Sequence, residues 1–167
     1  MKLLLVGAGA ALLAGLTGVV FFWPAQRVGP EPIVYGRDAC AHCRMHISQP
    51  GFAGELRDHD GVLTRYDDIG CMLRAMIAMH QEIPEAWVED HTSGEFIPLL
   101  IAQLVRGAAG DTPMGSGIVA FRDEGAAAAY AQSRGAVRMS LEDVVRNPAL
   151  VAQGPQTGQQ AKGKVER

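Results

Sequence analysis

A dense group of sulfur side chains occupies the segment RDACAHCRMHI, residues 37–47. It holds a C-x-x-C pair, Cys40 and Cys43, followed two positions later by Met45. Thiolates and thioethers are soft donors, which suit Cu(I) far better than Mg²⁺, Ca²⁺ or Mn²⁺. The same pair of cysteines could also form half of a zinc site or a dithiol switch.

The spacing of this segment predicts how the donors would meet. If residues 43–47 are extended, Cys43, Met45 and Ile47 point to one face of the strand. Cys40 can share a cation with Cys43 through the C-x-x-C turn. Two neighbouring histidines could add a nitrogen donor, His42 and His46.

The residues around the cysteines favour some of these roles over others. A redox-active C-x-x-C gains a low thiol pKa at a helix N-terminus, whereas Pro50-Gly51 interrupts this segment before a helix can form. A disulfide across such a small loop would stabilise little. Structural zinc is the stronger competitor, because Cys40, Cys43, Cys71 and a histidine would complete a tetrahedral set. Against it, the sequence has no second C-x-x-C or H-x-x-H pair.

A further thioether stands in the segment GDTPMGSG, where Met114 lies between a proline and a glycine. Methionine usually fills cores, but a methionine on a rigid turn is better placed to bind a metal. The methionines at helical spacing, Met72, Met76 and Met79, are predicted to pack instead. Cys71 lies beside that stripe, and the sequence leaves open whether it is buried filler or a third sulfur ligand.

The elements that must position these residues occur in two similar sets. In the first, strands are predicted over 52–57 and 62–66, on either side of a turn with Asp60-Gly61. Asp67 or Asp68 then caps a helix over 69–80, and a strand follows over 85–90. The two aspartates could alternatively orient a ligand from nearby Cys71.

The second set follows the same order. Extended apolar segments are predicted over 96–105 and 115–123, then a helix over 124–134 that ends at Gly135. A strand over 136–139 precedes a short helix capped by Ser140. Strand, strand, helix, strand thus occurs twice, which predicts an α+β protein of two small related units sharing one core, over 38–91 and 92–150.

The N-terminus is a candidate membrane anchor. No residue from Leu3 to Trp23 is charged, and the run is long enough to cross a hydrocarbon core of about 30 Å as a helix. A cleaved secretory signal is the alternative, but no convincing cleavage site follows, so a retained anchor over 1–25 is favoured. Residues 26–37 are predicted to be a linker and 151–167 a disordered tail.

Charge and cysteine number narrow the function classes further. The net charge is −3, which leaves no basic surface for nucleic acid. Whether the N-terminus is a retained anchor or a cleaved signal, the rest of the chain is expected to be exported. In an oxidising compartment three cysteines leave at least one thiol unpaired, unless a metal protects them.

Several segments together resemble the NosL family, the accessory proteins of nitrous oxide reductase. They are DACAHCRMHI, GFAGELRDHDGVLTRYDDIGCML, WVEDHTSGEFIPLLIAQLV and TPMGSGIVAFRDEGAAAAYAQSRG, in this order. The resemblance implies an exported, monomeric, non-enzymatic Cu(I) chaperone that gives copper to the apo-enzyme. It also implies two strand-strand-helix-strand units, similar to part of the organomercurial lyase fold.

The resemblance also implies a ligand set. The family's C-x-x-C-x-M matches Cys40, Cys43 and Met45, and its P-M-G turn matches Met114. His46 is an optional nitrogen ligand. Two positions depart from the family pattern: Arg44 replaces a glycine that is common there, and Val19 stands where family lipoproteins carry the lipid-bearing cysteine.

These inferences together predict a Cu(I)-binding domain facing the periplasm, held by a single N-terminal helix in the bacterial inner membrane. The acceptor is expected to be nitrous oxide reductase, or another exported copper enzyme such as a terminal oxidase. The rival functions are a membrane-tethered thiol oxidoreductase, a structural zinc domain for protein interaction, and a carbon–mercury lyase suggested only by fold analogy.

Overall fold

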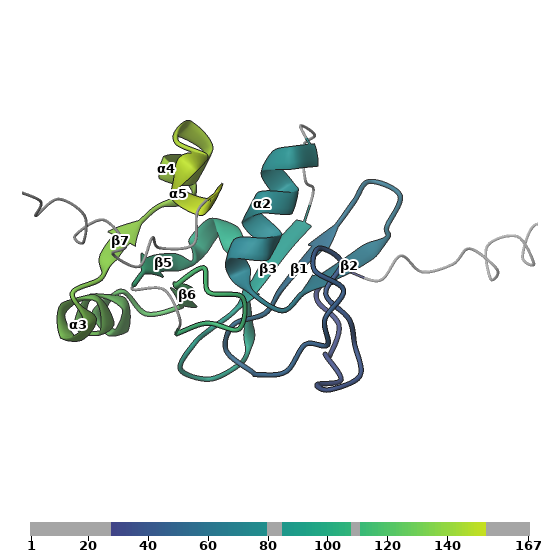
Figure 1. Ribbon diagram of the computed structural model, residues 1–167, viewed down its shortest axis with the longest axis horizontal. Helices are drawn as coiled ribbons and strands as arrows, with labels where there is room; N and C mark the ends of the chain where they lie inside the picture. The colour runs from purple at the N-terminus through teal and green to yellow at the C-terminus, as the bar shows by residue number, and fades with distance from the viewer. Residues whose placement is uncertain (1–27, 80–84, 108–110, 153–167) are drawn as a thin grey trace, which may run out of the picture.

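A computed structural model describes residues 28–79, 85–107 and 111–152 (Figure 1). The predicted anchor, and all but the first two residues of the predicted disordered tail, lie outside these residues. Within the described part of the chain, no helix is both long enough and apolar enough to span a bilayer.

The first unit contains the predicted hairpin, helix and strand, and one further strand. Its four strands form an antiparallel sheet in the order β2-β1-β3-β4. The hairpin turn closes because Asp58 Oδ1 accepts hydrogen bonds from the Asp60 and Val62 amides, and Gly61 adopts a φ of 80°. The elements are β1 (Gly54–Arg57), β2 (Leu63–Tyr66), α2 (Ile69–Met79), β3 (Glu85–Glu89) and β4 (Phe96–Pro98).

The second unit forms a three-stranded antiparallel sheet in the order β6-β5-β7. Its long helix begins after Asp123, whose side chain accepts from the Ala126 amide, and ends at Gly135 with a φ of 60°. Ser140 caps the next helix in a capping box with Asp143, as predicted. The elements are η1 (Leu99–Ile101), β5 (Gln103–Arg106), β6 (Ile118–Phe121), α3 (Glu124–Arg134), β7 (Val137–Met139), α4 (Leu141–Arg146) and α5 (Ala149–Ala152).

The predicted repeat is confirmed in its topology. In each unit the first strand is central and pairs with both the second and the third, as β1 pairs with β2 and β3, and β5 with β6 and β7. The segment 96–105 is not one continuous strand. A 3₁₀ turn after Pro98 divides it, so that β4 joins the first sheet and β5 the second.

The two units share one core, as expected. Helix α2 packs on β1 and β2 of its own unit and also contacts β6 of the other, and Figure 1 shows it standing between the two sheets. Met72 is fully buried, and a Cβ on Gly54 would lie only 2.5 Å from its sulfur. Met72 is therefore a packing residue, as predicted from its helical spacing, and Met76 also packs against the core. The same prediction is wrong for Met79, which is 39% exposed at the end of α2.

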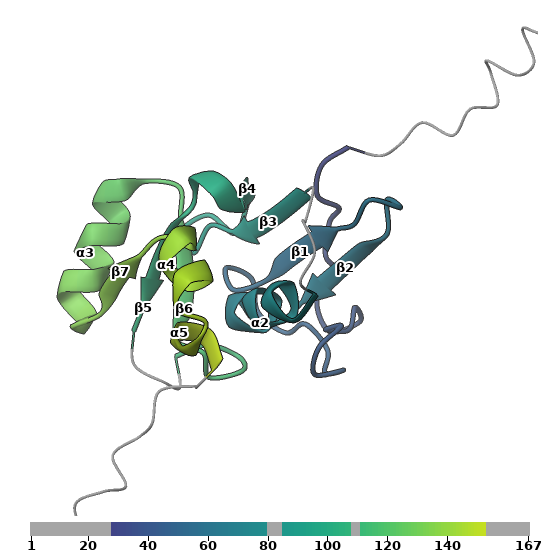
Figure 2. The same cartoon turned by 90° about the horizontal axis from the view of Figure 1, so that it is seen from above.

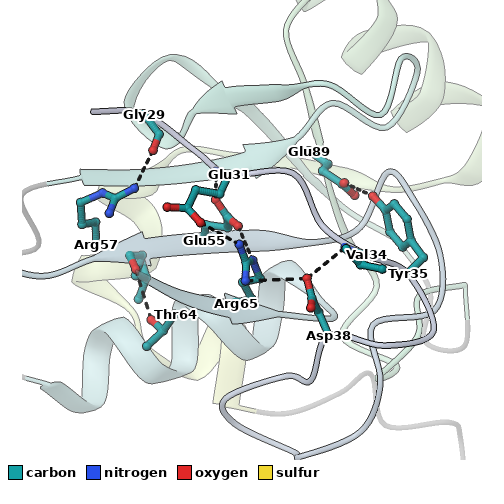
Figure 3. Close-up of polar contacts among 11 residues, drawn as sticks. Gly29, Glu31, Val34, Tyr35, Asp38, Glu55, Arg57, Thr64, Arg65 and Glu89 are labelled. Atoms are coloured by element: carbon teal, nitrogen blue, oxygen red, sulfur yellow. Dashed lines mark hydrogen bonds and ion pairs between the residues drawn. The ribbon is translucent and has the colours of Figure 1, made fainter. Parts of the chain in front are cut away.

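Residues 29–38 lie across the opposite face of the first sheet (Figure 3). The Glu31 amide donates to buried Glu55 at 2.9 Å, and the Tyr35 hydroxyl donates to buried Glu89. At the other end, Arg57 donates to the Gly29 carbonyl at 2.8 Å. Strand β1 is therefore covered on both faces, and the described part of the predicted linker contacts the sheet along its length.

Candidate metal centre

The C-x-x-C segment folds into a tight turn rather than a strand. The Arg44 amide donates to the Cys40 carbonyl at 2.9 Å, and the Cys40 amide donates to the Met45 carbonyl at 2.8 Å. Arg44 has a φ of 66°, and it is the only non-glycine residue with positive φ in the described residues. The predicted extended run over 43–47 is therefore wrong, because the chain reverses at Arg44 and breaks the alternation of faces.

The left-handed conformation of Arg44 is one that glycine, common at this position in the resembled family, adopts most easily. An L-residue with a Cβ adopts this region at a cost of roughly 1–2 kcal/mol, which glycine does not incur. The turn is thus glycine-type in its backbone, and arginine occupies it here with its side chain exposed. The change of residue leaves the turn itself in place.

Three free thiols meet through Cys40, which is fully buried. Its sulfur accepts hydrogen bonds from the Cys71 thiol and from the backbone amides of Cys43, Asp67 and His42. These donors, led by the Cys71 thiol, lower the pKa of Cys40 from its ordinary 9.0 to about 4. Of the three thiols, Cys40 is therefore the one whose surroundings most favour the thiolate.

The surroundings of the other two thiols favour their protonated form. The pKa of Cys71 is raised, first because its proton is held in the hydrogen bond to Cys40 and second because it is buried. The pKa of Cys43 is raised mainly by burial and also by its contact with Cys40. Cys43 is only half-buried, so it is the member of the group that an incoming ion would meet first.

Cys71 thereby belongs to the thiol group. The sequence alone left open whether it is buried filler or a third sulfur of the site. Helix α2 places it in its first turn, and Arg74 lies one turn further along the same face. The Arg74 guanidinium donates to Cys71 Sγ at 3.2 Å and to the Val151 carbonyl at 2.9 Å. Sequence reasoning missed Arg74, although its i, i+3 spacing from Cys71 is a signal that could have indicated it.

The turn that carries Met114 is fixed to the N-terminus of α2 by Asp68. One oxygen of the Asp68 carboxylate accepts from the Thr112 hydroxyl at 2.6 Å and from the Met114 amide at 3.1 Å. The other oxygen accepts from the Gly70 amide at 2.7 Å. Asp68 is thus a helix cap as predicted, and it positions the Met114 turn rather than the Cys71 side chain.

Close packing holds the same two elements together. A Cβ on Gly70 would lie 2.3 Å from the Ser116 Cβ, so only glycine allows the turn to approach α2 this closely. Met114 is half-buried and packs against the core cluster that contains Cys40 and Cys71, as does Cys43. The structure therefore places residues 40, 43, 71 and 114, which are far apart in the sequence, within or against one core cluster.

Met45 and His46 lie nearer the surface. Met45 is 52% exposed, and the exposed His46 ring has its Nδ1 3.2 Å from the Arg37 carbonyl oxygen. His42 contributes its amide to Cys40, while its side chain is exposed. These three side chains stay candidate ligands by sequence, at the rim of the thiol group.

The donor set limits the kind of metal site that these residues could form. Among residues 28–79, 85–107 and 111–152, no three His, Cys, Asp or Glu side chains are arranged to hold a metal ion. The thiols form a chain through Cys40 rather than a ring around one point. A tetrahedral zinc site of these residues is therefore not preformed, whereas a low-coordinate site completed by a thioether is compatible with the geometry.

Two aspartates make the surroundings of the sulfurs favourable to a cation. Asp67 is buried and accepts from the Ser48 amide at 3.0 Å. Its pKa is raised by burial and by the nearby Cys40 and Asp68, although the Ser48 bond opposes this. A cation bound at the thiols would offset this repulsion between neighbouring negative groups.

The described chain is thus an α+β protein of two repeated units, with a thiol group and a methionine turn packed in or against one core. Comparison identifies the family: the NosL family model matches residues 33–148, and the chain belongs to the NosL family. NosL is a family of copper chaperones, a non-enzymatic function, and the expectation that this chain is not an enzyme is confirmed.

A solved structure supports the fold. The copper chaperone NosL from Shewanella denitrificans superposes with a TM-score of 0.64 and 19% identity, covering 74% of this chain and 98% of that one. No curated protein matches the sequence. The two-unit α+β architecture is therefore that of the NosL fold.

Proposed function

We propose that this protein is a Cu(I) chaperone that carries the ion on Cys40, Cys43 and Met114, with Met45 and His46 as further donors. The observation that carries the proposal is the fully buried Cys40, in surroundings that favour its thiolate, beside the half-buried Cys43. A preformed thiolate binds a soft cation without first losing a proton to solvent. Family membership and the copper chaperone from Shewanella denitrificans support the choice of copper.

Transfer would proceed by ligand exchange, with copper remaining in the +1 state throughout. A donor of the acceptor protein first forms a bond to the ion at the exposed rim, and a bond from copper to one sulfur of this protein then breaks. Met45 is suited to this step because it is half exposed. A site with few ligands leaves a position open for the acceptor, which a closed four-ligand cage would not.

The acceptor that we propose is apo-nitrous oxide reductase, with a terminal oxidase as the alternative. The protein would act as a monomer, tethered to the bacterial inner membrane by residues 3–23 with its domain in the periplasm. The uncharged N-terminal run supports the tether. The relation to NosL supports the choice of acceptor.

Anaerobic titration of the full chain with Cu(I), against a chromophoric chelator, tests this function. We expect binding with one ion per chain, and Met114→Ala is expected to weaken it at least about tenfold, or ~1.4 kcal/mol. Met79→Ala is the matched control, because Met79 lies at the far end of α2 and is 39% exposed. Equal binding by Met114→Ala and wild type would remove Met114 from the site.

One observation favours a second function, a thiol–disulfide oxidoreductase: Cys40 has a lowered pKa and a neighbouring thiol. The metal-free protein would then reduce insulin disulfides in the presence of a thiol reductant, and Cys43→Ser would abolish the activity. An inactive wild type excludes this function. We favour the chaperone because Cys40 is fully buried, whereas an attacking thiolate needs access to its disulfide.

A further inference from the structure

We infer that one apolar edge of the domain lies against the membrane surface, with the thiol group at the other end of the first sheet. The edge is a groove of about 380 Å³, built where β3 begins and β4 ends. This inference rests on the membrane tether of the proposed function and adds an orientation to it. The side chains that line the groove include Val28, Met76, Trp87, Leu99 and Leu100.

The groove carries unusually exposed apolar side chains. Leu100 is 86% exposed and Val28 is 84% exposed, and these are the two most exposed large hydrophobic residues in the described part of the chain. Ile101, beside Leu100, is 58% exposed. Single exposed hydrophobic residues are common on protein surfaces, but three in adjoining positions mark a contact surface.

The chain itself brings this surface to the bilayer. The uncharged run ends at Trp23, and only Pro24, Ala25, Gln26 and Arg27 separate it from Val28. Five residue steps span at most roughly 17 Å. Val28 and the groove it lines must therefore lie within this distance of the membrane end of the tether. No other described exposed hydrophobic residue is held so close by the covalent chain.

The charges on the groove are compatible with contact between apolar side chains and lipid. Glu85 is the acidic residue that lines the groove, and its carboxylate lies 3.3 Å from the guanidinium of buried Arg57. This pairing neutralises the charge that would otherwise oppose insertion. The contact would be driven by apolar burial and would depend little on salt.

The same arrangement places the thiol group away from the membrane. Residues 29–38 run along the first sheet, from Gly29 beside Arg57 at the end of β1 to Tyr35 beside Glu89 at the end of β3 (Figure 3). Cys40 follows directly at that second end. In Figure 2, η1 beside β4 and the start of the described chain lie on one side, and the loop after residue 38 lies on the other. Copper would thus be offered to partners in the aqueous compartment.

The test uses the full chain in lipid nanodiscs that contain a phospholipid with a photoactivatable diazirine on its acyl chain. After illumination, crosslinked peptides are identified by mass spectrometry. We expect labelling within 3–23, at Val28 and within 98–102. The double variant Leu100→Glu/Ile101→Glu should lose the label at 98–102 while keeping that within 3–23.

Val137 and Val145 supply the matched control, since they are 67% and 61% exposed on the second unit. They should stay unlabelled, and Val137→Glu/Val145→Glu should leave the pattern unchanged. Label within 3–23 without label at 28 or 98–102 overturns the orientation and leaves the tether intact. Absence of label within 3–23 overturns the tether itself, and the orientation with it.

Discussion

At the scale of single residues, the turn that carries the thiols depends on a backbone conformation that its sequence does not favour. Arg44 stands at a φ of 66°, and its side chain is exposed. The residue therefore contributes strain to the turn without a compensating buried contact. The bonds on either side, between Cys40 and residues 44 and 45, maintain the conformation.

Replacing Arg44 by glycine should stabilise the protein. Glycine adopts positive φ without steric cost, so Arg44→Gly is expected to raise the free energy of unfolding by up to about 1 kcal/mol, part of the gain being offset by the larger entropy of the unfolded chain. Arg44→Ala is the control, since it removes the side chain but keeps the strain. Urea unfolding of both variants measures the change in the free energy of unfolding. If Arg44→Ala raises this free energy as much as Arg44→Gly does, the explanation from backbone strain is refuted.

The thiolate of Cys40 predicts a pH dependence for the metal-free protein. Its pKa is about 4 in the folded state and ordinarily 9.0. Because the folded value is lower, the contribution of this group to stability is complete above pH 9 and is lost as the pH falls toward 4. Cys71 acts oppositely, since its raised pKa makes the protein less stable above pH 9.

Stability should thus rise between about pH 5 and pH 8 because of Cys40. Unfolding by urea under anaerobic conditions at these two values measures the rise. The rise is expected to be smaller in Cys40→Ser, which lacks the thiolate, while other titrating groups affect both proteins alike. An identical pH dependence in the two proteins would show that Cys40 is not ionised in the folded state.

At the scale of elements, the candidate site depends on the contact between the N-terminus of α2 and the Met114 turn. Gly70→Ala places a Cβ 2.3 Å from the Ser116 Cβ. We expect the turn to be displaced, with a loss of about 1–3 kcal/mol in unfolding free energy from overpacking and weaker Cu(I) binding. Unfolding and Cu(I) titration measure the two effects.

Gly107→Ala is the control for this change, because its Cβ would lie no nearer than 3.7 Å to any neighbour. It should leave Cu(I) binding unchanged. If Gly70→Ala lowers stability but binds Cu(I) as tightly as wild type, the position of the turn does not matter for the site. That result would show that Met114 does not bind Cu(I) together with the thiols.

The elements themselves were largely predictable from local patterns. The hairpin at Asp60-Gly61, the helix end at Gly135 and the cap at Ser140 depend on residues that act within a few positions of themselves. The division of 96–105 into two strands was not expected. An apolar run cannot show on its own that its halves belong to different sheets.

The candidate site was predictable only in its residue types. Cys40, Cys43 and Met114 were identified from motifs, but the contact between Cys40 and Cys71 and the bonds from Asp68 to the Met114 turn join segments far apart in the chain. Positive φ at Arg44 was also hidden, since arginine gives no signal for it. The buried carboxylates Glu55 and Glu89 were missed because burial of charge depends on tertiary partners.

At the scale of the whole molecule, two small units enclose one core and place the thiol group where they meet. Helix α2 of the first unit contributes Cys71 to the thiol group. Asp68, just before this helix, binds the turn of the second unit that carries Met114. Neither unit alone therefore contains both the thiols and the Met114 turn. Residues 29–38 connect this end of the domain to the edge that faces the proposed tether. In the proposed orientation, the fold would separate the end held at the membrane from the end that offers copper.

The central claim is that the protein delivers Cu(I), and direct transfer tests it most sharply. The full chain, loaded anaerobically with Cu(I) in detergent micelles, is mixed with apo-nitrous oxide reductase, and the copper content of the separated acceptor is followed with time. We predict that copper reaches the acceptor faster than from a Cu(I)–chelator complex of matched affinity, and that Cys43→Ser abolishes this advantage. Transfer no faster than from the chelator would contradict the account.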